Sequence, residues 1–401
     1  MNLSPLTFYL IARAGMSLAS TMLTVAIGWH LYQLTGDPFD LALVGLVQIV
    51  PMLLLFILSG WVIDNFSRKT VLVVCALAET IIFLMLAMAM QAQEFDTTLV
   101  FTLLFFHGCA RAFFGPAQQA ILPNIVSREQ LSKAVAVTAI VWNVAFTSGP
   151  FVAGLLLAWV DRETYWVLSG FTLAAALAFV ALPVMQQKQP LGRGLAQVLG
   201  GIRFIKRSPI VLGCISLDLF SVMLGSVMAL LPIYAIDILK VGPEALGFLR
   251  GMPALGSVLI GLVMTKLPLP HPGKSLFLAL TAFSLSILVF AYSTHLWLSL
   301  IALWIYGAAD MVSVNIRSTL TQMATPDDLR GRVSAVNSIF IASSNEMGDF
   351  RAGAMATLLP ATATVALGGV MALAVAVGGY FLFPSIRNLS DYSQIEEPEA
   401  S

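Results

Sequence analysis

Charged residues are scarce in this chain. Asp, Glu, Lys and Arg make up 10% of its 401 residues, whereas a soluble domain carries about 25%. Hydrophobic residues make up 58%, and the mean hydropathy is +0.89. These values exclude an ordinary soluble protein, and the polar connectors between apolar runs are too short to hold a soluble catalytic domain.

Several chemical signatures are also missing. The three cysteines, Cys75, Cys109 and Cys214, have no paired spacing, so we expect buried thiols without a disulfide or metal role. The sequence contains no metal-ligand cluster, nucleophile arrangement or phosphate-binding loop. We therefore expect no enzyme activity, no cofactor, no bound metal and no nucleic-acid partner.

Long apolar runs dominate instead, and each is long enough to cross a bilayer at roughly 20 residues per span. They predict an all-α membrane protein with twelve transmembrane helices in two pseudo-symmetric six-helix bundles. The expected domains are an N-terminal bundle (1–185), a cytoplasmic linker with an amphipathic helix (186–208) and a C-terminal bundle (209–401). The predicted spans are 6–33, 39–63, 70–92, 97–119, 133–158, 164–185, 209–236, 244–266, 275–293, 296–318, 333–358 and 361–384.

An internal repeat supports this duplication. At an offset of 199 residues, Gly108, Gly149 and Gly154 align with Gly307, Gly348 and Gly353. At the same offset Arg111 aligns with Asp310, so the two copies differ in charge at corresponding depths. A duplicated apolar scaffold with charges near mid-membrane depth is typical of secondary transporters.

Basic residues give the orientation. With the N-terminus inside, fourteen of the 21 Lys and Arg residues fall in cytoplasmic segments, and five lie within the predicted spans. Only Arg162 and Lys240 fall on the outer side. We therefore expect both termini on the cytoplasmic side of a bacterial inner membrane. In the linker, Leu195, Val198, Leu199 and Ile202 recur at helical spacing, which predicts a short helix at the inner surface.

Ten ionisable residues lie within the predicted spans, and such residues are costly in hydrocarbon unless they are paired or face water. Counting from the span ends places Arg111 and Asp310 near the midplane. Glu346 and Asp349 share one helical face three residues apart. Arg13 and Glu79 enter from the same side to similar depths, which suggests a pair, and Arg317 is expected to extend toward the cytoplasmic surface. The ten are Arg13, Glu79, Arg111, Asp218, Arg250, Asp310, Arg317, Glu346, Asp349 and Arg351.

The acidic members are candidates for proton coupling, because two carboxylates close together in a medium of low dielectric constant cannot both ionise cheaply. The alternative for each is a permanent ion pair with an arginine. The candidates are Asp310, Glu346, Asp349, Asp218 and Glu79.

The arginines are candidates for binding an anionic substrate group, because guanidinium pairs with carboxylates through two hydrogen bonds. An internal ion pair, such as Arg111 with Asp310, is the alternative. His107, one turn before Arg111, could relay protons or simply pack in the bundle. The full set of substrate-binding candidates is Arg111, Arg351, Arg13, His107, Trp142, Asn143, Tyr306 and Asn345.

Two motifs carry a family resemblance. Residues 60–69 read GWVIDNFSRK between the second and third spans. Residues 149–154 in the fifth span read GPFVAG, where Pro150 bends the helix and the glycines allow close helix contact. Both resemble motifs of the major facilitator superfamily, in which the first forms a charge latch. Here Gly60 begins the first motif and Asp64, Arg68 and Lys69 would supply the latch, while Gly149 and Pro150 begin the second motif.

Further segments resemble the enterobactin-exporter-like branch of that superfamily, whose members export siderophores and macrolides. They are TGDP at 35–38, GIRFIKRSP at 201–209 and TPDDLRGRV at 325–333. The resemblance implies alternating access and proton-driven export of a small amphiphilic or anionic molecule, siderophore-like, by a monomer. The expected partners are the substrate, protons and the lipid bilayer.

The sequence leaves other functions open. Motifs do not fix direction, so an uptake symporter for a siderophore, peptide or lipid-like anion remains. A broad drug/proton antiporter, using aromatic cavity walls, is the second alternative. Sodium could replace protons, since carboxylates serve both ions.

Overall fold

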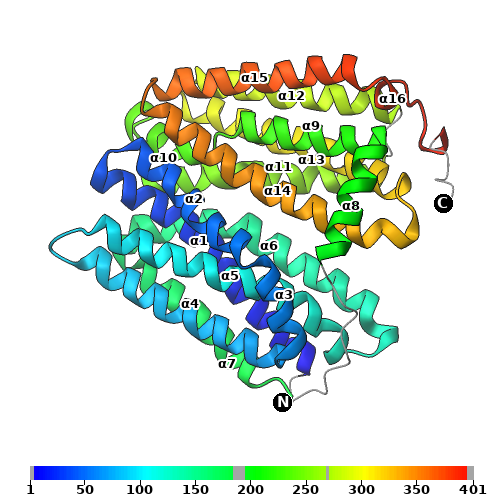
Figure 1. The fold of residues 1–401 in the computed structure, drawn as a ribbon. Coiled ribbons are helices and arrows are strands. Elements are labelled where there is room, and N and C mark those ends of the chain that lie inside the picture. The colour runs from blue at the N-terminus through cyan, green and yellow to red at the C-terminus, as the bar shows by residue number, and fades with distance from the viewer. Residues whose placement is uncertain (1–3, 184–194, 268–270, 395–401) are drawn as a thin grey trace. The chain divides into compact units, whose positions relative to one another are not determined.

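The computed structural model describes residues 4–183, 195–267 and 271–394, and every regular element in these ranges is helical (Figure 1). The elements are α1 (Pro5–Thr35), α2 (Pro38–Leu54), α3 (Phe56–Asn65), α4 (Arg68–Gln91), α5 (Thr97–Ile125), α6 (Arg128–Val160), η1 (Asp161–Glu163), α7 (Thr164–Val180), α8 (Leu195–Arg207), α9 (Pro209–Gly225), η2 (Met228–Leu230), α10 (Leu231–Ile233), the π-helix η3 (Tyr234–Ile238), α11 (Pro243–Met264), α12 (Pro272–Ala291), α13 (Leu296–Met323), α14 (Asp327–Ala356), α15 (Ala361–Leu382), α16 (Pro384–Arg387) and η4 (Tyr392–Gln394).

Nine helices within these ranges are long and apolar enough to cross a membrane, or ten if the bent pair α2 and α3 is one span. The all-helical membrane fold is therefore confirmed, whereas the count of twelve is not. The stretch Arg128–Val180 counts as one span of 53 residues, although η1 separates α6 from α7. Helix α14 is not among the nine, because polar and charged residues along its whole length keep its hydropathy low.

Contacts divide the chain into two compact units. The first comprises residues 1–36, 43–193 and 241–251, and the second comprises 37–42, 194–240 and 252–401. The first residues of α2 and of α11 thus group with the unit built mainly from the other half of the chain. The predicted boundaries of the two bundles and the linker remain a prediction.

In the first unit, α1 packs against α6 and α7, and α4 packs against α5 and α7. Local signals fix the helix ends. Gly36, with φ of 65°, ends α1 in the left-handed conformation that glycine adopts without strain. Asp96 accepts hydrogen bonds from the backbone N–H groups of Thr98 and Leu99 and so caps α5.

In the second unit, α12 packs against α13 and α15, and α9 packs against α14 and α15. The predicted span 209–236 is not one continuous helix. Helix α9 ends at Gly225, Ser226 is extended, and the chain resumes as η2, α10 and the π-helix η3. Irregular backbone at membrane depth needs partners for its free carbonyl and N–H groups. The residues that bond to this break are therefore of interest for function.

Glycines of the repeat mark equivalent close contacts in the two units. A Cβ atom added to Gly154 of α6 would lie 2.8 Å from the Cα atom of Gly247 in α11. A Cβ atom added to Gly353 of α14 would lie 2.8 Å from the Cα atom of Ala42 in α2. Residues 154 and 353 are related by the 199-residue offset, so the repeat read in the sequence reappears in helix packing.

Candidate transport site

Arg317 of α13 lies between two carboxylates in the second unit. Its guanidinium forms an ion pair with Asp218 of α9, and its Nη2 atom lies 3.7 Å from Oδ1 of Asp310, two turns earlier on α13. Its Nε also donates to the carbonyl of Ser313 at 3.2 Å. Arg317 is only 5% exposed, so the prediction that it extends to the cytoplasmic surface is wrong. Pairing with two acids inside the unit removes the reason for the guanidinium to reach for water.

The two carboxylates are not equivalent. The Asp218 side chain is 14% exposed and in close contact with the guanidinium, whereas the Asp310 side chain is 35% exposed and beyond hydrogen-bond distance. One positive charge thus faces two acids. Asp310 can therefore bind or release a proton without breaking the closer Asp218–Arg317 pair.

Tyr306 lies one turn before Asp310 on α13, and its ring centroid is 4.4 Å from that of Phe283 in α12. It is within electrostatic range of both Asp310 and Asp349. Two predicted residues, Asp218 and Asp310, are therefore brought together around Arg317, and Tyr306 lies beside Asp310.

Two α14 residues hold the break that ends α9. The Asp349 carboxylate accepts a hydrogen bond from the hydroxyl of Ser226. Arg351 donates from Nε to the carbonyl of Met223 at 3.1 Å and from Nη2 to the carbonyl of Ser226 at 3.3 Å. The last carbonyls of a helix have no partner within it and carry partial negative charge, so a guanidinium is a favourable cap there. Glu346 lies half-buried, one turn before Asp349.

In the first unit, Glu79 of α4 pairs with His107 of α5 at 2.7 Å, and both side chains are buried. The His107 ring lies 5.7 Å from that of Phe83. The suggested pairing of Glu79 with Arg13 is therefore replaced. Arg13 instead lies beside Tyr9, one turn earlier on α1.

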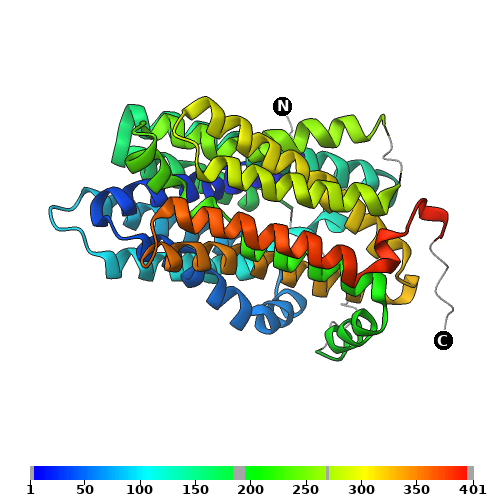
Figure 2. The ribbon, with the colours of Figure 1, turned by 90° about the horizontal axis from the view of Figure 1, so that it is seen from above.

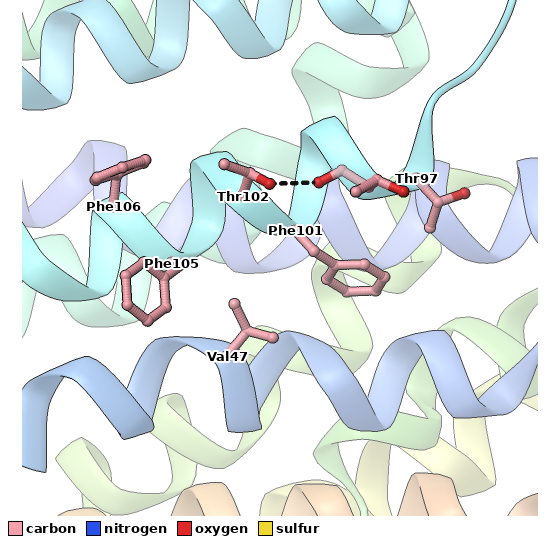
Figure 3. A pocket seen from close by; sticks show the side chains of 7 residues that line it. Val47, Thr97, Phe101, Thr102, Phe105 and Phe106 are labelled. Atoms are coloured by element: carbon pink, nitrogen blue, oxygen red, sulfur yellow. Dashed lines mark hydrogen bonds between the residues drawn. The ribbon is translucent and has the colours of Figure 1, made fainter.

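Arg111 stays exposed on α5 and donates from Nη1 to Oε1 of Gln48 in α2 at 3.1 Å. Next to Gln48 along α2, Val47 lines an open pocket with residues near the start of α5 (Figure 3). Its walls combine aromatic rings with threonine hydroxyl groups. The pocket residues are Val47, Thr97, Thr98, Phe101, Thr102, Phe105 and Phe106.

The remaining substrate candidates lie on exposed helix faces. Trp142 stacks on Phe146, with ring centroids 5.0 Å apart and planes inclined by 16°. The amides of Asn143 and Asn345 each donate to the carbonyl four residues earlier on their own helices. These side chains are accessible, but none of these hydrogen bonds draws them toward the acidic residues.

The two motif segments have structural contacts of their own. Arg68 donates to the carbonyl of Ala120 in α5 at 2.8 Å, and Lys69 donates to the carbonyl of Leu182, just beyond α7. Gly60 and Asp64 lie on the last turns of α3. These basic residues thus tie α4 to its neighbours in the first unit.

The glycine–proline motif sits where α6 approaches other helices closely. A Cβ atom added to Gly149 would lie 2.0 Å from Oγ1 of Thr21 in α1, and one added to Gly247 would lie 2.6 Å from the carbonyl oxygen of Pro150. The absence of a side chain at Gly149 and Gly247 therefore leaves room for α6 to lie close to α1 and α11.

The sequence reading missed a buried histidine. His30 of α1 contacts the Tyr165 hydroxyl through Nδ1 at 3.2 Å and Oδ1 of Asp161 through Nε2 at 2.9 Å. Its side chain is fully buried, whereas that of Asp161 is 64% exposed. The available signal was an ionisable side chain within the apolar run 6–33, the same pattern that identifies His107 in the fourth span.

Comparison with known proteins places this chain among transporters. A family profile described as transmembrane secretion effector matches residues 6–399. The enterobactin exporter EntS of Escherichia coli O1:K1 / APEC is 24% identical over 359 residues, which cover 89% of this chain and 86% of the relative. The EntS protein of Shigella dysenteriae serotype 1 (strain Sd197) is also 24% identical, over 363 residues.

Solved structures agree on the fold. A mutant of the nucleoside transporter NupG superposes with a TM-score of 0.75 at 13% identity, covering 96% of this chain and 100% of that one. A bacterial homologue of the human lysosomal transporter Spinster, in an inward-facing and unoccupied conformation, gives 0.73 at 13% identity and covers 96% of each chain. The predicted resemblance to the enterobactin-exporter-like branch is confirmed. The chain is a multi-pass membrane protein and a membrane transporter, and it belongs to the transmembrane secretion effector family of the major facilitator superfamily.

Proposed function

We propose that this protein is a proton-coupled exporter of a small amphiphilic or anionic molecule, siderophore-like, and that it works by alternating access. Twelve helices in two six-helix bundles would span the bacterial inner membrane, with both termini in the cytoplasm and the protein acting as a monomer. The basic residues of the predicted cytoplasmic segments support this orientation, and the similarity to an enterobactin exporter supports export.

The observation that carries the proton-coupling proposal is the sharing of Arg317 by Asp218 and Asp310. When both acids are ionised the group carries one net negative charge, which is costly away from water. Binding of one proton at Asp310 removes that charge and leaves the closer pair intact. Proton binding can therefore shift a conformational equilibrium by changing the cost of burying this group.

Arg111 is the candidate for binding an anionic group of the substrate. Arg111 is exposed, and it donates a hydrogen bond to the neutral amide of Gln48, so its charge is available to an anionic group. Arg351 is engaged at the break of α9, so we assign it the task of holding that break. Asp349, bonded to Ser226 there, and Glu346, on the same helix face, are the second candidates for proton coupling.

Vesicle transport tests the proposal. Everted vesicles containing the protein should accumulate labelled enterobactin when a pH gradient, acidic inside, is imposed. Asp310→Asn should abolish gradient-driven accumulation while equilibrium binding of enterobactin persists. Asp327→Asn, which removes an exposed carboxylate, is the matched control and should transport normally.

Other outcomes identify other functions. Accumulation only in right-side-out vesicles would replace export by uptake, and dependence on a sodium gradient would replace the proton. If Asp310→Asn keeps full pH-driven transport, Asp310 is removed from the mechanism; Glu346→Gln and Asp349→Asn are then tested in the same way.

A broad drug/proton antiporter is the second candidate function, and the open pocket of aromatic and threonine side chains beside α2 favours it (Figure 3). For such a transporter, Arg111→Gln would leave the efflux of cationic dyes unchanged and Phe105→Ala would reduce it. For an anion exporter, Arg111→Gln would instead reduce efflux of the anionic substrate.

A further inference from the structure

Helix α8 lies across the long helices of its own unit. Figures 1 and 2 show it at one end of α9 and α14, and in Figure 1 it runs across them. It packs against both of those helices. If α9 and α14 cross the membrane, a helix that runs across their ends lies near the membrane surface.

One face of α8 is fixed by packing. Ile205 is buried in a cluster with Val211 of α9 and with Val333 and Val336 of α14. The approach is close on this side, since a Cβ atom added to Gly201 would lie 2.8 Å from the carbonyl oxygen of Arg332. The apolar face in this part of α8 is therefore occupied by protein and does not need to insert into lipid. The side chains of 195–199 lie outside the described residues.

The opposite face is basic and exposed. Arg203, Lys206 and Arg207 are exposed, and within the described part of the chain none of them forms an ion pair with a carboxylate. Arg332 at the start of α14 is exposed beside Gly200 and extends the same surface. Lys206 and Arg207 also occupy the last turn of α8, where the helix dipole favours positive charge.

We propose that this basic face binds the headgroups of anionic phospholipids in the inner leaflet. The charge is complementary to that leaflet, and the packed apolar face holds α8 against the unit. Each Lys or Arg near an anionic membrane surface contributes about 1 kcal/mol. The inference rests on the proposed orientation, but it concerns lipid binding and not transport, so the two can fail separately.

The test is native mass spectrometry of the full-length protein in detergent. The protein is titrated with palmitoyl-oleoyl phosphatidylglycerol and, separately, with phosphatidylcholine bearing the same chains. Lys206→Gln/Arg207→Gln should weaken the first phosphatidylglycerol binding event by about 30-fold and leave phosphatidylcholine binding unchanged. Inorganic phosphate at millimolar concentration should not displace the lipid.

Lys266→Gln/Lys274→Gln is the matched control, because it removes two exposed charges of the same unit on the same predicted side of the membrane. It should retain phosphatidylglycerol binding to within about twofold. Equal loss in both double variants, equal affinity of the wild type for the two lipids, or displacement by phosphate overturns the proposal. An unchanged elution profile in size-exclusion chromatography confirms that each variant is folded.

Discussion

Replacing Arg317 by glutamine leaves two carboxylates facing each other in the second unit without a cation. The side chains of Arg317 and Asp218 are 6% and 14% exposed, so their pair is largely removed from water. Breaking a buried pair costs about 3–5 kcal/mol, because the remaining charge loses its compensation. Asp310 adds less, since it is more exposed and lies 3.7 Å away. We expect Arg317→Gln to lower the free energy of unfolding by about 3 kcal/mol.

A double-mutant cycle isolates the pair from other effects of the substitutions. The free energy of unfolding is measured in mixed micelles for Asp218→Asn, for Arg317→Gln and for both together. We expect a coupling energy of about 2 kcal/mol, because the double variant no longer buries an unpaired charge between these two positions. The control cycle uses Asp327 and Arg330, an exposed pair one turn apart on α14, for which about 0.5 kcal/mol or less is expected.

The cycle can refute the reasoning directly. If the two single losses add to within 0.5 kcal/mol, roughly the error of additivity for independent sites, the acids and the arginine do not interact as the structure places them. A coupling energy no larger than that of the exposed control pair would show that water reaches Arg317 freely. In either case one guanidinium shared by two acids could not support proton coupling.

Three further substitutions test other contacts. Gly154→Ala should cost roughly 1–3 kcal/mol and reduce transport, because its Cβ atom would meet backbone of α11, whereas Gly378→Ala, which meets nothing within 4 Å, should be neutral in thermal unfolding and uptake assays. Arg351→Lys keeps the charge but loses the planar donor set at the end of α9, so we expect a folded protein with reduced transport in vesicles. Glu79→Gln should lower the midpoint of thermal unfolding by removing the carboxylate that pairs with buried His107, and an unchanged midpoint would count against that pair.

The spans of this chain and the depths of its charged residues can be predicted from the sequence because the bilayer constrains both. It requires long apolar helices and penalises charge, so the spans and the depths of residues such as Asp310 follow from counting. Partners do not follow, because depth gives height along a helix and not the direction in which a side chain points. Arg317 and Asp218 are 99 residues apart, and only the packing of α13 against α9 brings them together.

Helix breaks are similarly hidden. The residues around Ser226 carry no proline that would end α9, and Pro232 lies beyond the break. What stabilises the interruption is a pair of side chains more than 120 residues later, Asp349 and Arg351. The sequence of residues 209–236 alone therefore does not reveal the cause of the break. For the same reason, the sequence predicts roles in proton coupling and substrate binding for Asp349 and Arg351, and not their contacts with Ser226 and Met223.

The two copies of the repeat share their packing glycines but differ in their charged residues. Gly108 lets α5 approach Gln48 and Pro51 of α2, and its counterpart Gly307 lets α13 approach Pro253 of α11. Packing positions have therefore kept their residue type. Three residues beyond each glycine, the first unit carries Arg111 and the second carries Asp310. If substrate attraction and proton binding were spread evenly over both units, these positions would have little reason to differ in sign. A chain with Arg111→Asp and Asp310→Arg exchanged should therefore fold, because Arg317 keeps Asp218 as its closer partner, but it should fail to couple transport to pH, because position 310 no longer carries an acid.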